Sequence, residues 1–511
     1  MKIALISTPT RTHSPNLIMP LGIMYLASYL EQLGHTVKII DIARTRQSNN
    51  VTIDELSKSK PDLIGISGII TAFRFVNELV RDLKKAFPDI PVVIGGHIVL
   101  DNYEMLLKST GCDYTITGYG EKPLSYLVEH LEKKRDIVDI PGLSYLKKGE
   151  VVHNPNYAFV DDMDSIPLPA YHLIDMEYYI TVYKKNPKLE AYLAKSGKPA
   201  PPMRSATVIA ARGCTDQCSF CVHEFEHKGF MVHSIAYVIN NIRFLYEKYQ
   251  ARIFGLGEDL FLYSAEQATQ LVNAMNAEFP DAYFYCSTRA DYVVRQGLAD
   301  VLKNSNCFYM AYGFESGSND MLKILNKRMT RDINVAAYKT ISKTNIYPAC
   351  SFMVGTPGET KETIKETIDA IKDARIVDSA VFFTTPYPGS RLFRWCVEQG
   401  LIKDVESYLD FISNRDATTL SINFTPYPDI IVKMMQIVVQ NALEDNKRQN
   451  DKRFKIPIKN LVIGHWIVPL LYESYFSGRK ALSLIFSRYQ RDTIKLNLNK
   501  RSTVMLSMDS H

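Results

Sequence analysis

Short apolar runs alternate with amphipathic stretches over the first 140 residues, and this alternation restricts the fold more than any other feature of the chain. Each apolar run has the length of a buried strand, and the stretches between the runs have helical spacing. Strand–helix alternation over five units predicts a doubly wound parallel sheet. The apolar runs are 3–7, 37–41, 63–67, 92–94 and 114–117, and the amphipathic stretches are 21–33, 53–58, 73–87, 102–108 and 123–131.

Small and polar residues follow the predicted strands of this first domain. In doubly wound sheets, ligands bind beyond the carboxyl ends of the strands, where glycine lets a large flat ligand approach the backbone. No GxGxxG follows the first strand, which disfavours a dinucleotide, and each glycine taken singly could be a turn residue. The segments are Ser7-Thr8-Pro9, Ser67-Gly68, Gly95-Gly96-His97 and Gly118-Tyr119-Gly120-Glu121.

A linker is expected between residues 141 and 204. Residues 141–154 predict a hairpin with Lys148-Gly149 as its turn. The proline-rich stretches 164–169 and 198–202 predict rigid, non-helical connectors. The tyrosine-rich piece between them, Tyr171 to Tyr192, is expected to pack against both neighbouring domains.

A second alternation between residues 205 and 400 predicts six more strands, and polar residues follow several of them. Barrels place functional residues at the carboxyl ends of strands. These side chains suit a ligand with an ammonium, a carboxylate and a ribose, although Arg289 could pair with Asp291 and Glu359 could start a helix. The strands are 207–210, 252–256, 283–287, 308–313, 347–354 and 380–384, and the polar residues are Glu258, Asp259, Arg289, Glu315, Ser316 and Gly355-Thr356-Pro357-Gly358-Glu359.

Three cysteines, Cys214, Cys218 and Cys221, follow the first of these strands at spacings of four and three residues. A loop of this kind can wrap three thiolates around one face of an iron–sulfur cube. A cube needs four ligands, so either a remote cysteine completes it or one iron stays open for a substrate, which the spacing favours. Zinc with His223 and His227, or incidental buried cysteines, are the alternatives.

The loop resembles the CxxxCxxC signature of radical S-adenosylmethionine (SAM) enzymes, including Phe220 before the last cysteine. The resemblance implies a [4Fe-4S] cluster held by Cys214, Cys218 and Cys221 in a partial (β/α)6 TIM barrel. It implies that the open iron chelates SAM, and that an electron from a flavodoxin- or ferredoxin-type donor splits SAM into methionine and a 5'-deoxyadenosyl radical. The SAM-binding residues that it implies are Phe220, Glu258, Asp259, Arg289, Glu315, Ser316, Gly355, Thr356 and Pro357.

The first domain is similar to the cobalamin-binding domain that precedes many radical SAM cores. The matching pieces are residues 19–27, 34–37, 94–97 and 117–121. The DxHxxG motif that donates a histidine to cobalt elsewhere is absent, and His97 is interpreted as a buried hydrogen-bonding residue. Some relatives keep this fold without cobalamin. The cobalamin-binding residues that the resemblance implies are Thr8, Pro9, Leu21, Gly22, Ser67, Gly68, Gly95, Gly96, His97, Gly118, Gly120 and Glu121.

Composition limits the partners and the compartment. The net charge of +5 over 511 residues is too weak to indicate nucleic acid. Eight scattered cysteines suit a reducing compartment. The N-terminus lacks a signal-peptide pattern, and no uncharged apolar run reaches the length of a spanning helix, so we expect a cytoplasmic protein.

The C-terminal region, residues 401–511, matches no motif and is expected to be small and mainly helical. From Asp451 onward it has eleven Lys or Arg against four Asp or Glu. It could be a packed helical cap, a lid over an acidic substrate, or a peripheral contact with anionic membrane through Trp466 and Ile467. The proposed apolar face is Leu471, Tyr475, Leu482, Ile485, Phe486 and Tyr489, with Arg479, Lys480, Arg488 and Arg491 outside it.

Together these features predict an α/β protein of four parts: a Rossmann-like cobalamin-binding domain (1–140), a hairpin and linker (141–204), a radical SAM core (205–400) and a helical basic region (401–511). The resemblance implies a C-methyltransferase that acts on an unactivated carbon of a small-molecule or lipid-like substrate, using a 5'-deoxyadenosyl radical and methylcobalamin. The alternatives are an oxidative cyclase, ring-contracting enzyme or dehydratase with the same domains. A more remote one is a non-catalytic zinc or corrinoid binding protein.

Overall fold

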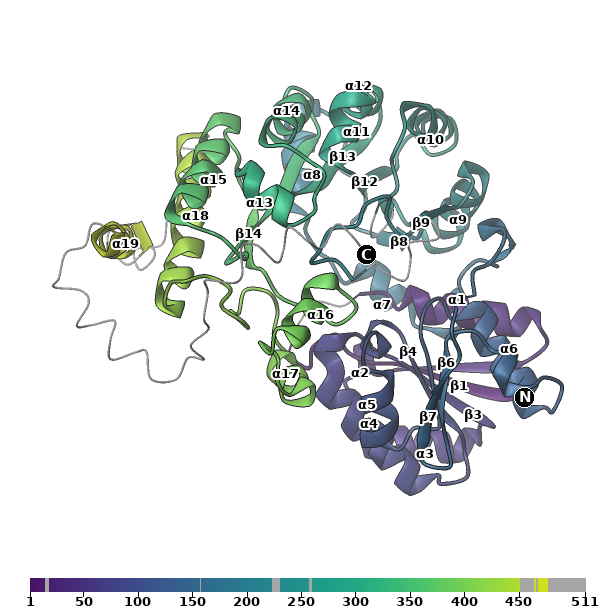
Figure 1. The fold of residues 1–511 in the computed structure, drawn as a ribbon. Helices are drawn as coiled ribbons and strands as arrows, with labels where there is room; N and C mark the ends of the chain where they lie inside the picture. The colour runs from purple at the N-terminus through teal and green to yellow at the C-terminus, as the bar shows by residue number, and fades with distance from the viewer. Residues whose placement is uncertain are drawn as a thin grey trace.

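Two parallel sheets, each packed against helices, form the bulk of the computed structural model (Figure 1). The structure describes residues 1–13, 18–156, 158–222, 230–256, 260–450, 464–465 and 467–476. The sequence-based prediction of an α/β fold with a doubly wound first domain and a barrel-like second domain is confirmed.

The first sheet has seven strands in the order β2-β1-β3-β4-β5-β6-β7. Its first five strands are parallel, and the hairpin expected in the linker extends the same sheet by antiparallel pairing of β6 with β5. The strands are β1 (Lys2–Ser7), β2 (Thr36–Asp41), β3 (Leu63–Ser67), β4 (Val92–Gly95), β5 (Tyr114–Ile116), β6 (Leu143–Lys147) and β7 (Glu150–His153).

Helices cover both faces of this sheet, because successive strand residues point to opposite sides. Ile3 and Leu5 of β1 enter a core shared with α1 and α6, whereas Ala4 and Ile6 enter a second core shared with α3, α4 and α5. The helices are α1 (Leu21–Gln32), α2 (Ile42–Thr45), α3 (Asn49–Ser59), α4 (Phe73–Ala86), α5 (Tyr103–Thr110) and α6 (Glu121–Leu131), with the 3-10 turns η1 (Ile70–Ala72), η2 (His97–Val99) and η3 (Ile137–Asp139).

The tyrosine-rich linker contacts both domains, as the sequence predicts. Tyr179 donates a hydrogen bond of 2.7 Å to Asp41 at the end of β2, and buried Tyr171 donates one of 2.7 Å to Asn241 in the second domain. Its elements are η4 (Met163–Ser165), η5 (Tyr171–Leu173), α7 (Met176–Thr181) and α8 (Pro187–Ser196).

The second sheet has six parallel strands in the order β15-β14-β13-β12-β11-β8, so β8 and β15 lie at its two edges. This is an open barrel of six strand–helix units. The strands are β8 (Ser205–Val208), β11 (Ile253–Leu256), β12 (Tyr283–Ser287), β13 (Cys307–Glu315), β14 (Tyr347–Val354) and β15 (Ala380–Phe383). The helices outside it are α9 (Ile235–Tyr249), α10 (Ala265–Glu278), α11 (Ala290–Arg295), α12 (Leu298–Leu302), α13 (Asn319–Ile324), α14 (Arg331–Ser342) and α15 (Lys361–Ala374).

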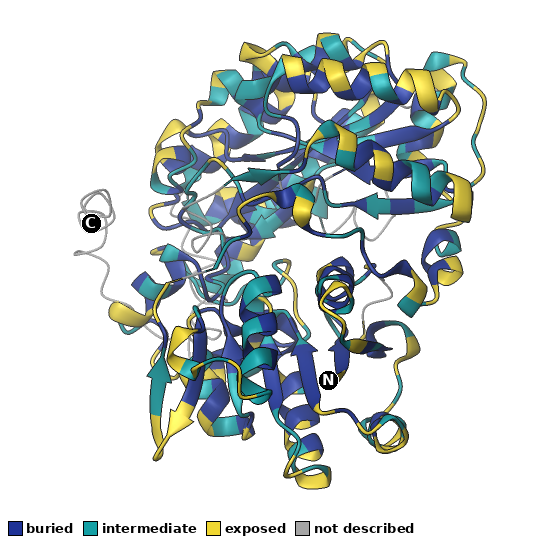
Figure 2. Ribbon diagram, turned by 90° about the vertical axis from the view of Figure 1, so that its right-hand side faces the viewer, coloured by how far each residue is buried: buried dark blue, intermediate teal, exposed yellow. Residues whose placement is uncertain are grey.

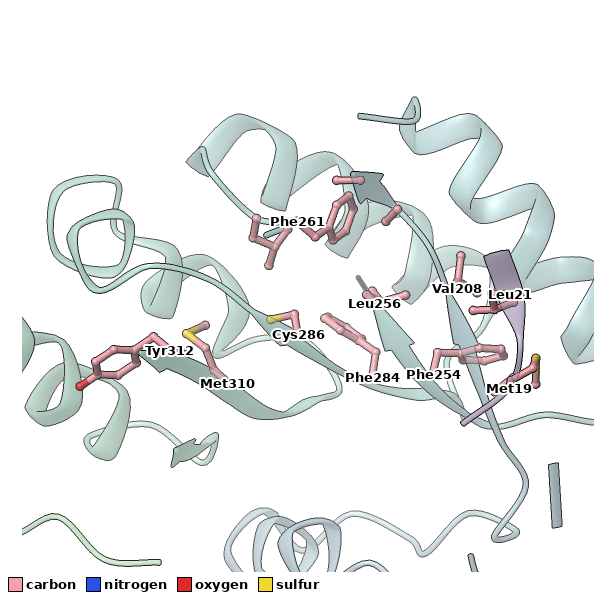
Figure 3. Packing of buried hydrophobic residues seen from close by; sticks show 14 of the residues in the cluster. Met19, Leu21, Val208, Phe254, Leu256, Phe261, Phe284, Cys286, Met310 and Tyr312 are labelled. Atoms are coloured by element: carbon pink, nitrogen blue, oxygen red, sulfur yellow. The ribbon is translucent and has the colours of Figure 1, made fainter. Parts of the chain in front are cut away.

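The apolar core continues from one domain into the other. Met19 and Leu21 of the first domain lie in the same buried cluster as Val208 and Phe254 of the second (Figure 3). Buried segments run through both sheets, and exposed residues concentrate on the outer helices and loops (Figure 2). Because this interface is apolar and continuous, it favours a fixed arrangement of the two sheets.

The chain after β15 is mainly helical. Helices α16 (Arg391–Glu398) and α17 (Val405–Ile412) share a buried core with α4 and α5 of the first domain. Helices α18 (Asp429–Asn450) and α19 (Val468–Phe476) follow, and α18 lies along α15. Within the described ranges, no helix is both long enough and apolar enough to cross a membrane. Leu471 and Tyr475 lie on α19, while Trp466 and the other tail residues named above, from Arg479 onward, lie outside the described residues.

Candidate active site

The three cysteines lie on a loop that is closed at its base by a short β-ribbon. Strand β9 (Ala211–Arg212) pairs antiparallel with β10 (Met231–Val232), so the loop begins and ends at the same place. Gly213 has a φ of +82°, a left-handed conformation that turns the chain from β9 into Cys214. The ribbon follows β8, which places the cysteines at the carboxyl end of the barrel strands.

Ribbon residues Ala211 and Arg212 line a cavity of about 310 Å³, and the loop that the ribbon carries lines a larger one of about 710 Å³. The larger cavity is the interior of the open barrel, and all three cysteines, Phe220, Arg289 and Glu315 line it. The barrel is hollow because small residues of three neighbouring strands line it, namely Ser287, Ala311, Gly313 and Ser351. Its volume suits a ligand of nucleotide size.

Glu315 lies at the end of β13 in a strained conformation. Its φ is +61°, which is unfavourable for a residue with a side chain. The carboxylate folds back over Gly313, where a methyl group would overlap it, and accepts a hydrogen bond of 3.0 Å from Lys327. Burial alone would lower the pKa of Lys327, but the Glu315 carboxylate raises it, so the ammonium stays charged.

Arg289 connects the cysteine loop to the third barrel strand. Its guanidinium donates to Asp216, between the first two cysteines, and at 3.0 Å to Asp291. The Arg289 and Asp216 side chains are only 11% and 6% exposed, so this is a buried ion pair. The alternative pairing of Arg289 with Asp291 therefore occurs, together with a second carboxylate. Its predicted clamp on the SAM carboxylate stays a prediction.

The other described residues that the sequence predicts to bind SAM, Ser316, Gly355, Thr356 and Pro357, do not line the barrel cavity. The Ser316 hydroxyl lies 3.2 Å from that of Thr367, and the Glu359 carboxyl accepts hydrogen bonds from the amides of Gly355 and Thr356. Burial raises the pKa of Glu359 to about 8. Pro357 lies in the same loop, while Glu258 and Asp259 lie outside the described residues, as do the alternative zinc ligands His223 and His227.

The smaller cavity lies between the two domains, at the carboxyl ends of the strands of the first sheet. A third cavity of about 160 Å³ adjoins it and shares Gly22 and Ser67 with it. The predicted cobalamin residues are all brought together here: Gly22, Ser67, Gly95, Gly96, His97, Gly118, Gly120 and Glu121 line the interdomain cavity, and Thr8, Pro9, Leu21, Gly22, Ser67 and Gly68 line its neighbour.

The glycines of this edge make room for a ligand. A methyl group on Gly22 would meet nothing within 4 Å, so it would project into the cavity. Gly96 has a φ of +85°, and a methyl group there would lie 2.6 Å from the Gly68 carbonyl oxygen. His97 is half-buried and lines the cavity, which corrects its interpretation as a buried residue. The edge therefore fits a flat ligand laid against the backbone.

Several residues at these sites carried no sequence signal. Asp216 occupies one of the positions that the CxxxCxxC pattern leaves unspecified, and Lys327 follows Lys323 in a run of charges that is typical of a surface. Lys188 of α8 lies at the opposite end of the barrel cavity, 4.3 Å from the centre of the Tyr309 ring. Arg212 forms a buried pair with Glu121 across the domain interface at 2.7 Å. The place of each of these side chains in the site depends on contacts with other segments of the chain, which a local sequence pattern does not reveal.

Two protein families match the two sheets. The B12 binding domain model matches residues 8–128, and the Radical SAM superfamily model matches residues 208–371. The chain is a radical SAM enzyme with a B12-binding domain. The first match ends within α6, and the second begins at the end of β8.

Relatives of this radical SAM enzyme include methyltransferases and cyclases. An uncharacterized methyltransferase of Pyrococcus horikoshii is 28% identical over 79% of this chain and 84% of its own. An anaerobic magnesium-protoporphyrin IX monomethyl ester cyclase of Rubrivivax gelatinosus is 24% identical over 76% of this chain and 68% of its own. The methyltransferase TsrM of Kitasatospora setae, solved with cobalamin and a [4Fe-4S] cluster, has the same fold, with a TM-score of 0.62 at 19% identity over 78% of this chain and 75% of TsrM.

The three loop cysteines are chemically suited to bind an iron–sulfur cluster. All eight cysteines of the chain are free thiols, and only the three of the loop are partly exposed. In the part of the chain that the structure describes, no three His, Cys, Asp or Glu side chains lie close enough together to hold a single metal ion. A cube places each thiolate on a different iron, so its ligands lie further apart than those of one ion.

Proposed function

We propose that the enzyme is a cobalamin-dependent radical SAM C-methyltransferase. The observation that carries the proposal is that one short segment bounds both cavities. Ile209, Ala211 and Arg212 line the interdomain cavity, and Cys214 and Asp216 line the barrel cavity. Methylation of an unactivated carbon requires that one substrate atom be reached from a SAM site and from a methyl donor, and adjacent cavities meet this requirement.

In this proposal Cys214, Cys218 and Cys221 hold a [4Fe-4S] cluster, the barrel cavity holds SAM, and the interdomain and adjoining cavities hold cobalamin. When bound, these groups supply the electron, the hydrogen-abstracting radical and the methyl group. The chain's own residues bind, orient and shield them. Glu315 is fixed by Lys327 where it can accept hydrogen bonds from ribose hydroxyls, and Phe220 packs beside the cysteines against apolar residues.

The substrate in this proposal is a small or lipid-like molecule, and the electron donor is a flavodoxin or ferredoxin. Apolar side chains such as Leu5, Ile66 and Leu124 line the interdomain cavity, which excludes water where cobalamin and an apolar substrate would meet. Free thiols suit a reducing compartment such as the cytoplasm. A peripheral membrane contact through the basic C-terminal residues is a further part of the proposal.

Two measurements without the substrate test this function. The enzyme is purified without oxygen from cobalamin-fed cells, and its optical spectrum is recorded. It is then incubated with methyl-labelled SAM and reductant. We expect corrinoid absorption, label recovered with the corrinoid, and slow formation of 5'-deoxyadenosine. A protein with no corrinoid and no SAM-sensitive cluster signal in electron paramagnetic resonance would contradict the proposal and favour a zinc protein.

A radical cyclase or another radical outcome is the second candidate, favoured by the cyclase relative. Both functions use the same cluster loop, so the loop does not separate them. Candidate substrates taken from neighbouring genes are therefore incubated with methyl-labelled SAM and reductant. A methyltransferase places label in the product, whereas a cyclase leaves the label in methionine.

A further inference from the structure

The β-ribbon that carries the cysteine loop is anchored to the preceding part of the chain on both of its strands. Strand β9 supplies Arg212, and β10 is followed directly by His233. The amide of His233 donates to the Ala210 carbonyl at 3.0 Å, so the two residues lie at the same end of the ribbon. The loop with the cysteines extends from the other end.

The first anchor is the buried pair of Arg212 and Glu121. The Arg212 guanidinium donates to the Glu121 carboxylate at 2.7 Å, and the two side chains are 8% and 5% exposed. The guanidinium carbon also lies 5.4 Å from the Tyr25 ring centre and 5.1 Å from that of Tyr119. Glu121 begins α6 and the two tyrosines belong to the first domain, so three of its side chains surround one arginine.

The second anchor joins His233 to the linker. The Asp164 carboxylate accepts a hydrogen bond of 3.1 Å from Nδ1 of His233 and one of 3.0 Å from the Ser234 amide. The imidazole is stacked on Tyr237, with ring centres 3.8 Å apart and planes inclined by 6°. The stacking on Tyr237 therefore fixes the plane of the His233 ring, and the hydrogen bond to Asp164 fixes its rotation within that plane.

Fully buried ion pairs seldom add net stability, because desolvation of the two charges offsets their attraction. They do fix geometry, since a small displacement leaves a charge unpaired in an apolar place. Arg212 also lies two residues before Cys214 and lines the interdomain cavity together with Glu121. A shift in this pair would therefore alter the relation between the cysteine loop and that cavity.

We propose that Arg212 and Glu121 are a positioning pair that fixes the cysteine loop relative to the interdomain cavity, with His233 and Asp164 as a second hold on the same ribbon. This inference rests on the proposed function for its consequence, since positioning matters only if both cavities serve one reaction. It changes the role of Glu121 from a ligand for the corrinoid to a partner for Arg212.

The first test uses protein without cofactors. Glu121→Gln removes the charge at constant size, and Arg212→Lys keeps the charge but loses the planar fork. Hydrogen exchange of peptides that cover residues 210–213 and 231–234 should become at least fivefold faster in both variants, whereas peptides of β12 and β13 should not change. Unchanged exchange at the ribbon would overturn the proposal.

Glu177→Gln is the matched control. Glu177 of α7 makes a bidentate pair of 2.6 Å with Arg204, whose guanidinium also donates to the Tyr249 carbonyl of the second domain, and the Glu177 side chain is 62% exposed. Exchange at the ribbon should stay at the wild-type rate. If Glu121→Gln fails to fold, the double variant Glu121→Gln/Arg212→Gln, which leaves no buried charge unpaired, takes its place.

The second test uses the holoenzyme and its methyl acceptor, once this is known. In Glu121→Gln, the 5'-deoxyadenosine formed per methyl transferred should rise at least fivefold, with iron content and bound corrinoid as in the wild type. A fall in corrinoid affinity with an unchanged ratio would overturn the proposal and make Glu121 a binding residue. If the wild type transfers no methyl group, the proposed function fails, and the exchange experiment decides the anchoring by itself.

Discussion

The ammonium of Lys327 lies 3.0 Å from the carboxylate of Glu315, and the two side chains are only 12% and 8% exposed. The pair holds Glu315 in its left-handed conformation at the end of β13, beside the cysteines. Removing either partner would leave the other side chain buried without the charge that compensates it.

Removing Lys327 should therefore destabilise the core of the enzyme. We expect Lys327→Met to lower the free energy of unfolding by about 3 kcal/mol, because Glu315 loses its buried partner. Denaturant unfolding followed by circular dichroism measures this loss. Lys323→Met, at an exposed position of α13, is the control and should change stability little. Equal losses of unfolding free energy in the two variants would contradict the stabilising role of the buried pair.

Glu359 should make the enzyme less stable as the pH rises through the neutral range. Its pKa is raised by burial from 4.5 to about 8, so the folded state binds more protons than the unfolded chain between these values. Stability from this group is complete below pH 4.5 and is lost as the pH approaches 8. Glu359→Gln should match the wild type near pH 4 and exceed it by roughly 4 to 5 kcal/mol near pH 8.5.

Thermal unfolding of the wild type and of Glu359→Gln across this pH range checks the prediction, because other titrations cancel in the difference. Glu362→Gln, in the exposed first turn of α15, is the control for the loss of a glutamate from the same segment. A flat difference for Glu359→Gln would mean that its carboxyl stays ionised in the fold.

The sequence predicts the sheets well because both kinds of strand are short, apolar and separated by helical stretches. Residues 252–256, for example, were expected as a strand and form β11 at Ile253–Leu256. It also predicts the residues that line the interdomain cavity and its neighbour, since the carboxyl ends of parallel strands meet at one edge, but only Phe220, Arg289 and Glu315 of the predicted SAM-binding residues line the barrel cavity. The cysteine spacing predicts the family from eight residues alone.

The partners of those residues are not predictable in the same way. Arg212 and Glu121 are separated by 91 positions, and Arg289 and Asp216 by 73, so neither pair has a local pattern. A buried charge such as Lys327 resembles a surface charge in sequence, because its burial depends on contacts with segments that are distant from it in the chain. The sequence therefore predicts where the candidate ligand-binding residues lie, but not which buried partners hold them in place.

Gly96 should be required for the corrinoid cavity. An alanine there would strain a φ of +85° and would also place its methyl group 2.6 Å from the Gly68 carbonyl oxygen. We expect Gly96→Ala to weaken binding of hydroxocobalamin at least tenfold, with normal uptake of iron and sulfide. Gly111→Ala is a matched control, since its φ is +80° but nothing lies within 4 Å. Equal binding by the two variants would remove the steric argument.

Arg289 could bind the carboxylate of SAM or hold the cysteine loop through Asp216, and Arg289→Lys separates these two roles. Lysine keeps the charge but cannot bind two carboxylates through a planar fork, so a guanidinium that clamps SAM should not be replaceable. We expect the SAM concentration that half-shifts the cluster signal in electron paramagnetic resonance to rise at least tenfold, at unchanged iron content.

Arg295→Lys, at the exposed end of α11, is the control for this substitution and should bind SAM as the wild type does. Asp291→Asn provides the opposite comparison, because it frees part of the guanidinium and should leave SAM binding equal or tighter. If Arg289→Lys binds SAM normally but loses iron, the guanidinium acts through Asp216 on the cysteine loop, because the buried pair at the loop is then its whole contribution.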